Sequence, residues 1–157
     1  MRLWSGILAL TTALLVSGCG FSPAFGTNSR AEDLRNQVVV STPSSRIGFY
    51  LRAALQDRFG LVDEGRYALD VAVDQERTVA AVSEDGDTTR FDLTGRANWT
   101  LMEMGQAVGQ GTATSFSSYS ATGSTVAAQS AADDAEVRLA AKIAELIVAD
   151  LILLTVP

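Results

Sequence analysis

The chain has 157 residues, with 18 acidic side chains against 12 basic ones and no histidine, which gives a formal net charge of −6 at pH 7. An acidic chain repels the phosphates of nucleic acids, so no nucleic-acid partner is expected. The lack of histidine, together with a single cysteine, excludes histidine-dependent catalytic triads and the usual zinc sites, and we expect neither a cofactor nor a metal.

The N-terminus has the composition of a bacterial lipoprotein export signal. Arg2 precedes an apolar run over residues 3–16, and the small residues Ser17 and Gly18 lead to Cys19. At 1.5 Å per residue this run of about 14 residues reaches only ~21 Å, short of the ~30 Å core of a bilayer. We therefore expect residues 1–18 to be removed and Cys19 to carry the lipid anchor; the alternative is an ordinary secretory signal that ends near a cysteine.

The first part of the mature chain is predicted to be a tether followed by a strand and a helix. Residues 19–36 are mostly polar, with Gly and Pro breaks and one apolar cluster at 21–25, which favours a lipidated tether. The Val-rich residues 37–41 predict a buried strand, and Ser44 or Ser45 is expected to cap a helix that stops at Gly60. The predicted apolar face of this helix comprises Ile47, Tyr50, Leu51, Ala54, Leu55 and Phe59.

The middle of the chain predicts three consecutive antiparallel strands. Apolar side chains alternate with Ala and Asp over residues 67–74 and with polar residues over 91–101, which is the period of a half-buried strand. The acidic, Gly-containing residues 83–87 predict the turn of a long hairpin. Residues 107–120 are rich in Gly, Ser and Thr, so this third strand is expected to pack weakly and to lie at an edge.

From Thr125 onward the helical period returns and predicts a second long helix. The order β-α-β-β-β-α predicts an α+β fold, a two-layer sandwich in which a four-stranded, mostly antiparallel sheet carries two helices on one face. Residues 37–157 are expected to form this single domain. The predicted buried face of the last helix comprises Val137, Ala140, Ala141, Ala144, Ile147, Val148 and Leu151.

Few side chains in this sequence suit catalysis. Lys142 lies within a regular helical pattern, Asp133 and Asp134 fall in the first turns of the last helix, and Asp85 and Asp87 fall in a hairpin turn. Such residues stabilise those structures without any further role. A non-enzymatic protein is therefore expected, and a hydrolase that uses two convergent carboxylates is the enzymatic alternative.

Short motifs occur in a fixed order along nearly the whole mature chain. They are Cys19-Gly20-Phe21-Ser22-Pro23-Ala24-Phe25-Gly26, Leu51-Arg52, Arg58-Phe59, Tyr67-Ala68-Leu69-Asp70-Val71, Thr89-Arg90-Phe91, Trp99-Thr100-Leu101, Ser118-Tyr119 and Ala131-Ala132-Asp133-Asp134-Ala135 with Arg138 after it. In this order, and with the predicted β-α-β-β-β-α layout, the chain resembles the lipopolysaccharide-assembly lipoproteins of the LptE family, in their alphaproteobacterial form.

The resemblance implies a periplasm-facing outer-membrane lipoprotein that occupies the lumen of the LptD β-barrel in a one-to-one complex and assists lipopolysaccharide insertion into the outer leaflet. It also implies contacts between basic side chains and lipopolysaccharide phosphates. Arg90 and Arg77, near the acidic hairpin turn, are the nearest candidates, and a cross-strand salt bridge with Glu84 or Asp92 is their structural alternative. The alternative function is an accessory lipoprotein of an ABC-type lipid-trafficking system.

Overall fold

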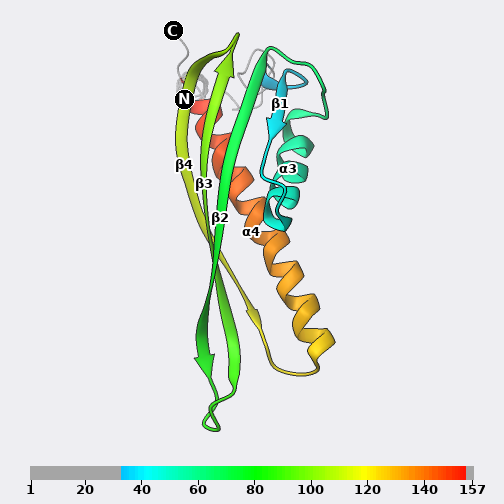
Figure 1. The fold of residues 1–157 in the computed structure, drawn as a ribbon, viewed down its shortest axis with the longest axis vertical. Coiled ribbons are helices and arrows are strands. Elements are labelled where there is room, and N and C mark those ends of the chain that lie inside the picture. The colour runs from blue at the N-terminus through cyan, green and yellow to red at the C-terminus, as the bar shows by residue number, and fades with distance from the viewer. Residues whose placement is uncertain (1–32, 155–157) are drawn as a thin grey trace, which may run out of the picture.

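The computed structural model describes residues 33–154, so the predicted export signal and the predicted lipidation site Cys19 lie outside the described residues. The element order confirms the predicted β-α-β-β-β-α layout (Figure 1). The elements are β1 (Val38–Ser41), α3 (Arg46–Phe59), β2 (Tyr67–Val82), β3 (Thr88–Glu103), β4 (Gln106–Ser120) and α4 (Thr125–Leu153).

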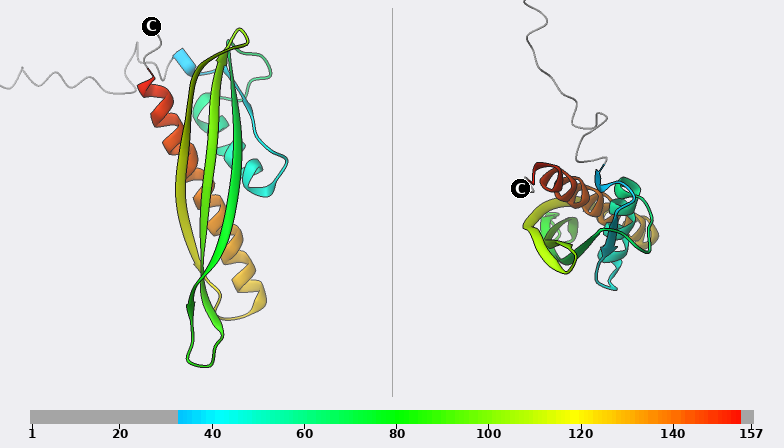
Figure 2. Two further views of the ribbon diagram at one scale, coloured as in Figure 1. Left: turned by 60° about the vertical axis from the view of Figure 1, so that its left-hand side comes forward. Right: turned by 90° about the horizontal axis from the view of Figure 1, so that it is seen from above.

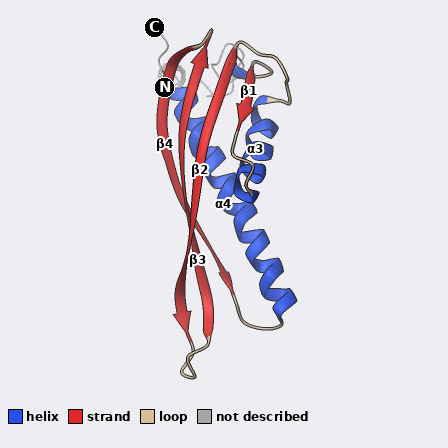
Figure 3. Ribbon diagram, in the orientation of Figure 1, coloured by secondary structure: helices blue, strands red, loops and turns tan. Residues whose placement is uncertain are grey.

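The four strands form one mixed sheet in the order β1-β2-β3-β4. β1 runs parallel to β2 because α3 connects them as a crossover, whereas tight turns make the other pairs antiparallel. Both helices cover one face of the sheet (Figures 2 and 3). The predicted α+β sandwich is confirmed, and β4 lies at an edge of the sheet as predicted.

Helix α3 begins and ends where its sequence predicts. The side chain of Ser45 accepts a hydrogen bond from the amide of Gly48 at 3.2 Å, and Gly60 ends the helix with φ +95°. The buried side chains of Leu51 and Leu55 then face the sheet and α4.

Gly48 is required by the close approach of the β1–α3 loop. A Cβ atom at this position would lie 2.2 Å from the carbonyl oxygen of Pro43, which belongs to the backbone and cannot rotate away. Helix propensity alone would favour alanine here by about 1 kcal/mol. Overpacking costs ~1–3 kcal/mol and more against a rigid neighbour, so the clash decides the sign.

We therefore expect Gly48→Ala to lower the free energy of unfolding by about 1–2 kcal/mol after the propensity gain is subtracted. Chemical denaturation measures this change. Ala53→Gly, at an exposed position of the same helix, is the matched control for propensity, and its expected cost is about 1 kcal/mol. A more stable Gly48→Ala variant would contradict the assigned contact.

The β2–β3 hairpin extends beyond the helix-covered body of the molecule (Figure 2). Burial on β2 alternates through Leu69, Val71 and Val73 and then ceases, although the strand continues to Val82. The predicted turn is confirmed: the amide of Ser83 donates to the carbonyl of Asp87 at 2.8 Å. Both strands are thus longer than their alternating segments, because cross-strand pairing continues where one face is no longer buried.

The buried face of α4 differs from the predicted one. Val137 is 44% exposed, so its predicted burial is wrong, and Leu139 and Ile143 are fully buried instead. Val137 and Leu139 are two positions apart, about 200° around the helix, and so cannot share a face. Leu139 and Ile143 fit because Gly95 of β3 faces them: a Cβ there would lie 2.8 Å from Cδ1 of Ile143.

The folded unit begins before the predicted boundary at residue 37. Leu34 is 6% exposed and belongs to the hydrophobic core, and the amide of Asn36 donates to the carbonyl of Phe59 at 2.5 Å. The mostly polar composition of residues 27–36 conceals this single apolar contact. The last residues of the predicted tether are therefore part of the domain.

Candidate binding cleft between the sheet and the last helix

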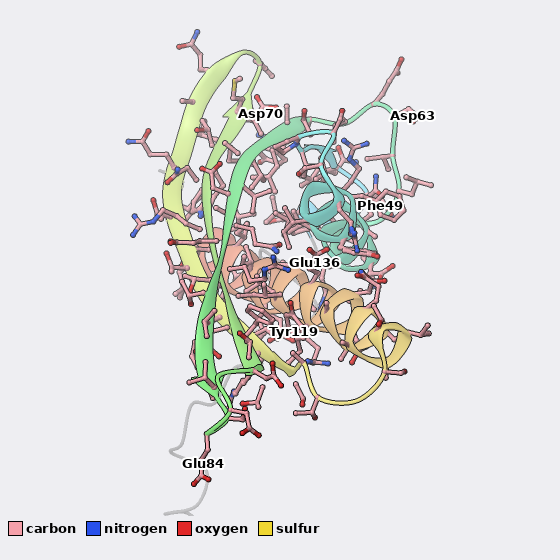
Figure 4. All side chains as sticks on the ribbon, turned by 60° about the horizontal axis from the view of Figure 1, so that its bottom comes forward. Phe49, Asp63, Asp70, Glu84, Tyr119 and Glu136 are labelled. Atoms are coloured by element: carbon pink, nitrogen blue, oxygen red, sulfur yellow. The ribbon has the colours of Figure 1, made fainter. Side chains whose placement is uncertain are left out.

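A cleft of about 530 Å³ lies between the first half of α4 and the half of the sheet that is nearer the β2–β3 turn. Tyr119 and Glu136, from its two sides, lie between the strands and α4 in Figure 4, and Glu84 marks the hairpin turn beyond them. The cleft is lined by Gln75 and Arg77 of β2, Phe91 and Leu93 of β3, Tyr119 of β4, Arg46 of α3, the α4 residues Thr125, Ala128, Gln129, Ala132, Asp133 and Glu136, and Ala121 of the β4–α4 loop.

The sheet wall of the cleft carries two aromatic rings and a guanidinium. Phe91 and Tyr119 are directly paired across β3 and β4, and their rings stack with centroids 5.4 Å apart. The guanidinium carbon of Arg77 lies 4.9 Å from the Phe91 centroid, and its Nη1 donates to the Tyr119 hydroxyl at 3.5 Å. Among residues 33–154, no carboxylate lies within ion-pair distance of Arg77.

A second arginine closes the opposite side of the cleft, and its charge is compensated. Arg46 pairs with Asp133, and its Nε lies 3.4 Å from Oε2 of Glu136. Glu136, and then Asp133, raise the pKa of Arg46 above its usual value. Gln75 donates to Oε1 of Glu136 at 3.1 Å. These contacts join α3, α4 and β2. Arg77 is the cation of the described cleft that makes no ion pair, and together with Arg46 it balances the charges of Asp133 and Glu136.

A carboxylate hydrolase needs two carboxylates that are free to act on a substrate. The two carboxylates of this cleft are both held by other side chains. Asp133 accepts from Gln129 at 2.9 Å as well as from Arg46, and Glu136 is held by Arg46 and Gln75. Within the described part of the chain, no three His, Cys, Asp or Glu side chains group in a way that could hold a metal ion. The contacts of these two carboxylates are those of a structural ion-pair network.

Comparison with known families decides the assignment. The family model described as "LptE: Lipopolysaccharide-assembly" matches residues 35–151, which include all six described helices and strands except the last two residues of α4. The chain belongs to the LptE family. This confirms the resemblance seen in the sequence motifs. A search of curated protein sequences finds no match to the chain.

Solved structures share the LptE-type fold. A putative lipoprotein from Caulobacter crescentus superposes with a TM-score of 0.67 at 26% identity, covering 79% of this chain and 93% of that one. A minor lipoprotein from Acinetobacter baumannii gives 0.54 at 15% identity over 74% and 90% of the two chains. Rare lipoprotein B from Shewanella oneidensis gives 0.50 at 13% identity over 73% and 96%. The last two show similarity of fold alone.

In this LptE-family chain the two predicted contact residues lie on opposite faces of the sheet. Arg77 contacts Phe91 on the helix-covered face, whereas Arg90 precedes Phe91 in β3 and so points the other way. Arg90 donates to Oγ of Ser118 at 2.8 Å, and its Nε lies 3.7 Å from Oδ1 of Asp92. Arg90 thus has an ion pair with Asp92, but within β3 and not across strands as the alternative predicted. The structure does not bring the two arginines together.

Sequence reasoning missed Arg46, Gln75 and Glu136 as cleft residues. The first and last of these are ninety positions apart, and no short motif links them. The strand period could have placed Gln75 and Arg77 on the helix side, because both continue the phase of the buried residue Val73.

No helix within residues 33–154 of this LptE-family protein has the length and apolar character needed to cross a membrane.

Proposed function

We propose that this protein is an outer-membrane lipoprotein that faces the periplasm, is anchored through Cys19, fits into the LptD β-barrel and assists lipopolysaccharide insertion into the outer leaflet. The observation that carries the proposal is the LptE family match over residues 35–151. The presence of Gly20 after Cys19 supports outer-membrane sorting, because aspartate at that position is the inner-membrane retention signal. The role is assembly and requires no covalent chemistry.

The surface of the sheet supports a role inside a barrel. Its uncovered face carries polar side chains such as Asp74, Arg96, Asn98 and Thr112, and the lumen of a transmembrane barrel is also polar. Thr112 donates to Asn98 at 2.8 Å, so part of this face is ordered by its own hydrogen bonds. A rigid polar surface can form many hydrogen bonds with a polar lumen without exposing an apolar core.

The free edge of β4 is a second supporting feature. β4 spans Gln106–Ser120 without a charged residue or a proline, and its far side has no strand partner in the described sheet. Natural proteins usually protect such edges with charges, prolines or bulges. By contrast, β2, which is free beyond its short pairing with β1, carries Asp74, Glu76 and Arg77. The pairing of β4 with β3 has one register shift, at Val108, so the edge lacks these protections from Gly109 onward. Such an edge is consistent with a surface that a partner covers.

Arg90 and Arg77 remain proposed lipopolysaccharide contacts, now as two separate positions. Arg90 would contact a phosphate from the uncovered face, whereas Arg77 would contact one only from within the cleft.

Co-expression with the LptD barrel tests the proposed function. We expect a one-to-one complex on size-exclusion chromatography, since a domain enclosed in a lumen buries far more than the ~1,600 Å² of a standard interface. Leu51→Asp, which is expected not to fold, controls for non-specific capture by the barrel. Separate elution of the folded protein and the barrel would contradict the proposal, and co-purification of an inner-membrane permease would favour the ABC-accessory alternative.

A further inference from the structure

The free edge of β4 presents backbone groups that the sheet does not use. In an antiparallel strand, the N–H and C=O groups of alternate residues point to opposite sides. Just after β4, the amide of Ala121 donates to the carbonyl of Thr89 in β3 at 2.9 Å, and the register is unbroken back to Gly109, so the odd-numbered residues bond to β3. The carbonyl of Ser118 accepts instead from Arg138 of α4 at 3.2 Å. The backbone groups of the even-numbered residues therefore point away from the sheet.

Part of this edge keeps its outward backbone groups unpaired. Among residues 33–154, no hydrogen bond reaches the outward groups between Gly109 and Ser118. At Ser118 itself, Arg138 closes the edge. The open stretch, residues 110–116, is about 23 Å long at 3.3 Å per residue. Its outward donors and acceptors belong to Gln110, Thr112, Thr114 and Phe116.

An aromatic side chain lies exposed beside this open stretch. The even-numbered residues of β4 direct their side chains to the uncovered face of the sheet, where Thr112 bonds to Asn98. Phe116 on this face is 73% exposed, and its partner in β3, Thr94, is too small to cover the ring. The ring can therefore be buried only by a group from outside the domain. The other aromatic residues of β3 and β4 lie on the helix-covered face and are at least partly buried; they are Phe91, Trp99 and Tyr119.

The chemistry of the edge determines which segment fits it. β4 has no charged residue, so a charged side chain placed beside it would lose hydration without gaining an ion pair from this strand. An apolar side chain opposite Phe116 would bury the ring as a cross-strand pair, and hydroxyl side chains suit the positions opposite Thr112 and Thr114. A second copy of the chain is a poorer match, because each copy carries a net charge of −6.

We propose that residues 110–116 of β4 bind an uncharged, extended segment of the barrel partner as an additional strand, with an apolar side chain of that segment on Phe116. In this mode of recognition the backbone hydrogen bonds supply the affinity, and the side chains set the register. The identity of the partner rests on the proposed function, whereas the strand addition follows from the edge itself.

Amide hydrogen exchange tests the proposal on the full-length lipoprotein in detergent, alone and in the co-expressed barrel complex. Mass spectrometry with residue-level fragmentation reads single amides. In the free protein the outward amides of residues 110–116 should exchange fast and the inward ones slowly. In the complex the outward amides should slow at least about tenfold, because each gains a hydrogen bond. The amides of Gln75 and Arg77, which point outward at the β2 edge, control for enclosure without strand pairing.

Matched variants test the edge by competition. Each variant is co-expressed with the barrel and with the unmodified lipoprotein under a different tag, and the ratio in the barrel-bound fraction is measured. Thr114→Pro removes an outward N–H that β3 does not use, which an edge strand tolerates, and it should reduce the variant's share at least about tenfold. Thr114→Val keeps the N–H and should compete equally. Phe116→Ser should reduce the share about threefold. Slow exchange of the inward amides establishes that each variant is folded.

The results distinguish this proposal from the proposed function. A complex in which the outward amides of residues 110–116 still exchange fast, or slow no more than those of Gln75 and Arg77, would overturn strand addition and leave the function standing. Slowing that depends on the concentration of the lipoprotein alone would identify a second copy as the occupant and would also overturn the proposal.

A second probe decides the case in which no complex forms and the proposed function fails. It is a synthetic nine-residue peptide in which threonine alternates with valine and one central phenylalanine, added at millimolar concentration to the lipoprotein alone. Slowing confined to the outward amides of residues 110–116, and absent from Thr114→Pro, would support strand addition without the barrel. Unchanged exchange in that case would overturn it.

Discussion

Leu51→Asp is expected to prevent the domain from folding, whereas Ala53→Asp, two positions along the same helix, is expected to leave it folded. Leu51 has no exposed surface and lies at the centre of the core, while Ala53 faces solvent. An aspartate at position 51 would lose the burial of the leucine and bring an unpaired carboxylate into an apolar environment. That cost is several kcal/mol out of the ~5–15 kcal/mol that stabilises a domain of this size.

Circular dichroism during thermal and urea unfolding measures the difference. The Ala53→Asp variant should show a cooperative transition with a midpoint close to that of the unmodified protein, and Leu51→Asp should show none. Two similar transitions would contradict the assigned faces of α3.

Arg52→Asp should fall between these two variants. Its Nε donates to Oγ1 of Thr42 at 3.1 Å, and its Nη2 donates to the Thr42 carbonyl at 3.0 Å. Hydrogen bonds that involve a charged donor contribute ~1.5–3 kcal/mol each when buried and less when partly exposed, as here. The sequence period correctly places Leu51 inward, but it does not reveal that Arg52 holds the loop between β1 and α3.

The elements that sequence patterns predict well are those whose burial is decided by local alternation. In β3, Leu93, Ala97 and Trp99 alternate with exposed residues over the middle of the strand, so period 2 is visible without any tertiary information. In α3, the Ser45 cap and the Gly60 stop both stand at the ends of a clear apolar stripe. Local chemistry and tertiary packing agree in these segments.

The patterns fail where tertiary contacts override composition. α4 is apolar on more than one side, so the sequence cannot distinguish Val137 from Leu139, and the choice is made by the space above Gly95 on the sheet. Leu34 stands alone among polar residues, and only its place in the three-dimensional core marks it as part of the domain. Neither contact leaves a periodic signal.

The candidate cleft is predictable only in part for the same reason. Arg77 stands out as a basic residue near the hairpin turn, but its value as a binding group depends on stacking with Phe91 and on the distance from other carboxylates. The compensation of Arg46 depends on a contact between α3 and α4 across the fold. Charge alone therefore identifies candidates, and packing decides which of them can bind an anion.

Cys19→Ala is expected to abolish lipidation and to leave an unprocessed precursor, because both acylation and lipoprotein-type cleavage depend on the cysteine thiol. The proposed anchor would hold the mature protein through its acyl chains, since each buried CH₂ contributes ~0.8 kcal/mol and more than one chain is needed for a stable anchor. Ser17→Ala, which keeps a small residue before the cleavage site, is the matched control and should be processed and acylated normally.

Mass spectrometry of the membrane and periplasmic fractions distinguishes the products by their N-terminal residue and acyl mass. A mature N-terminus at position 19 without acyl mass in the Cys19→Ala variant would show that an ordinary signal peptidase cleaves the chain, and the lipid anchor would have to be abandoned.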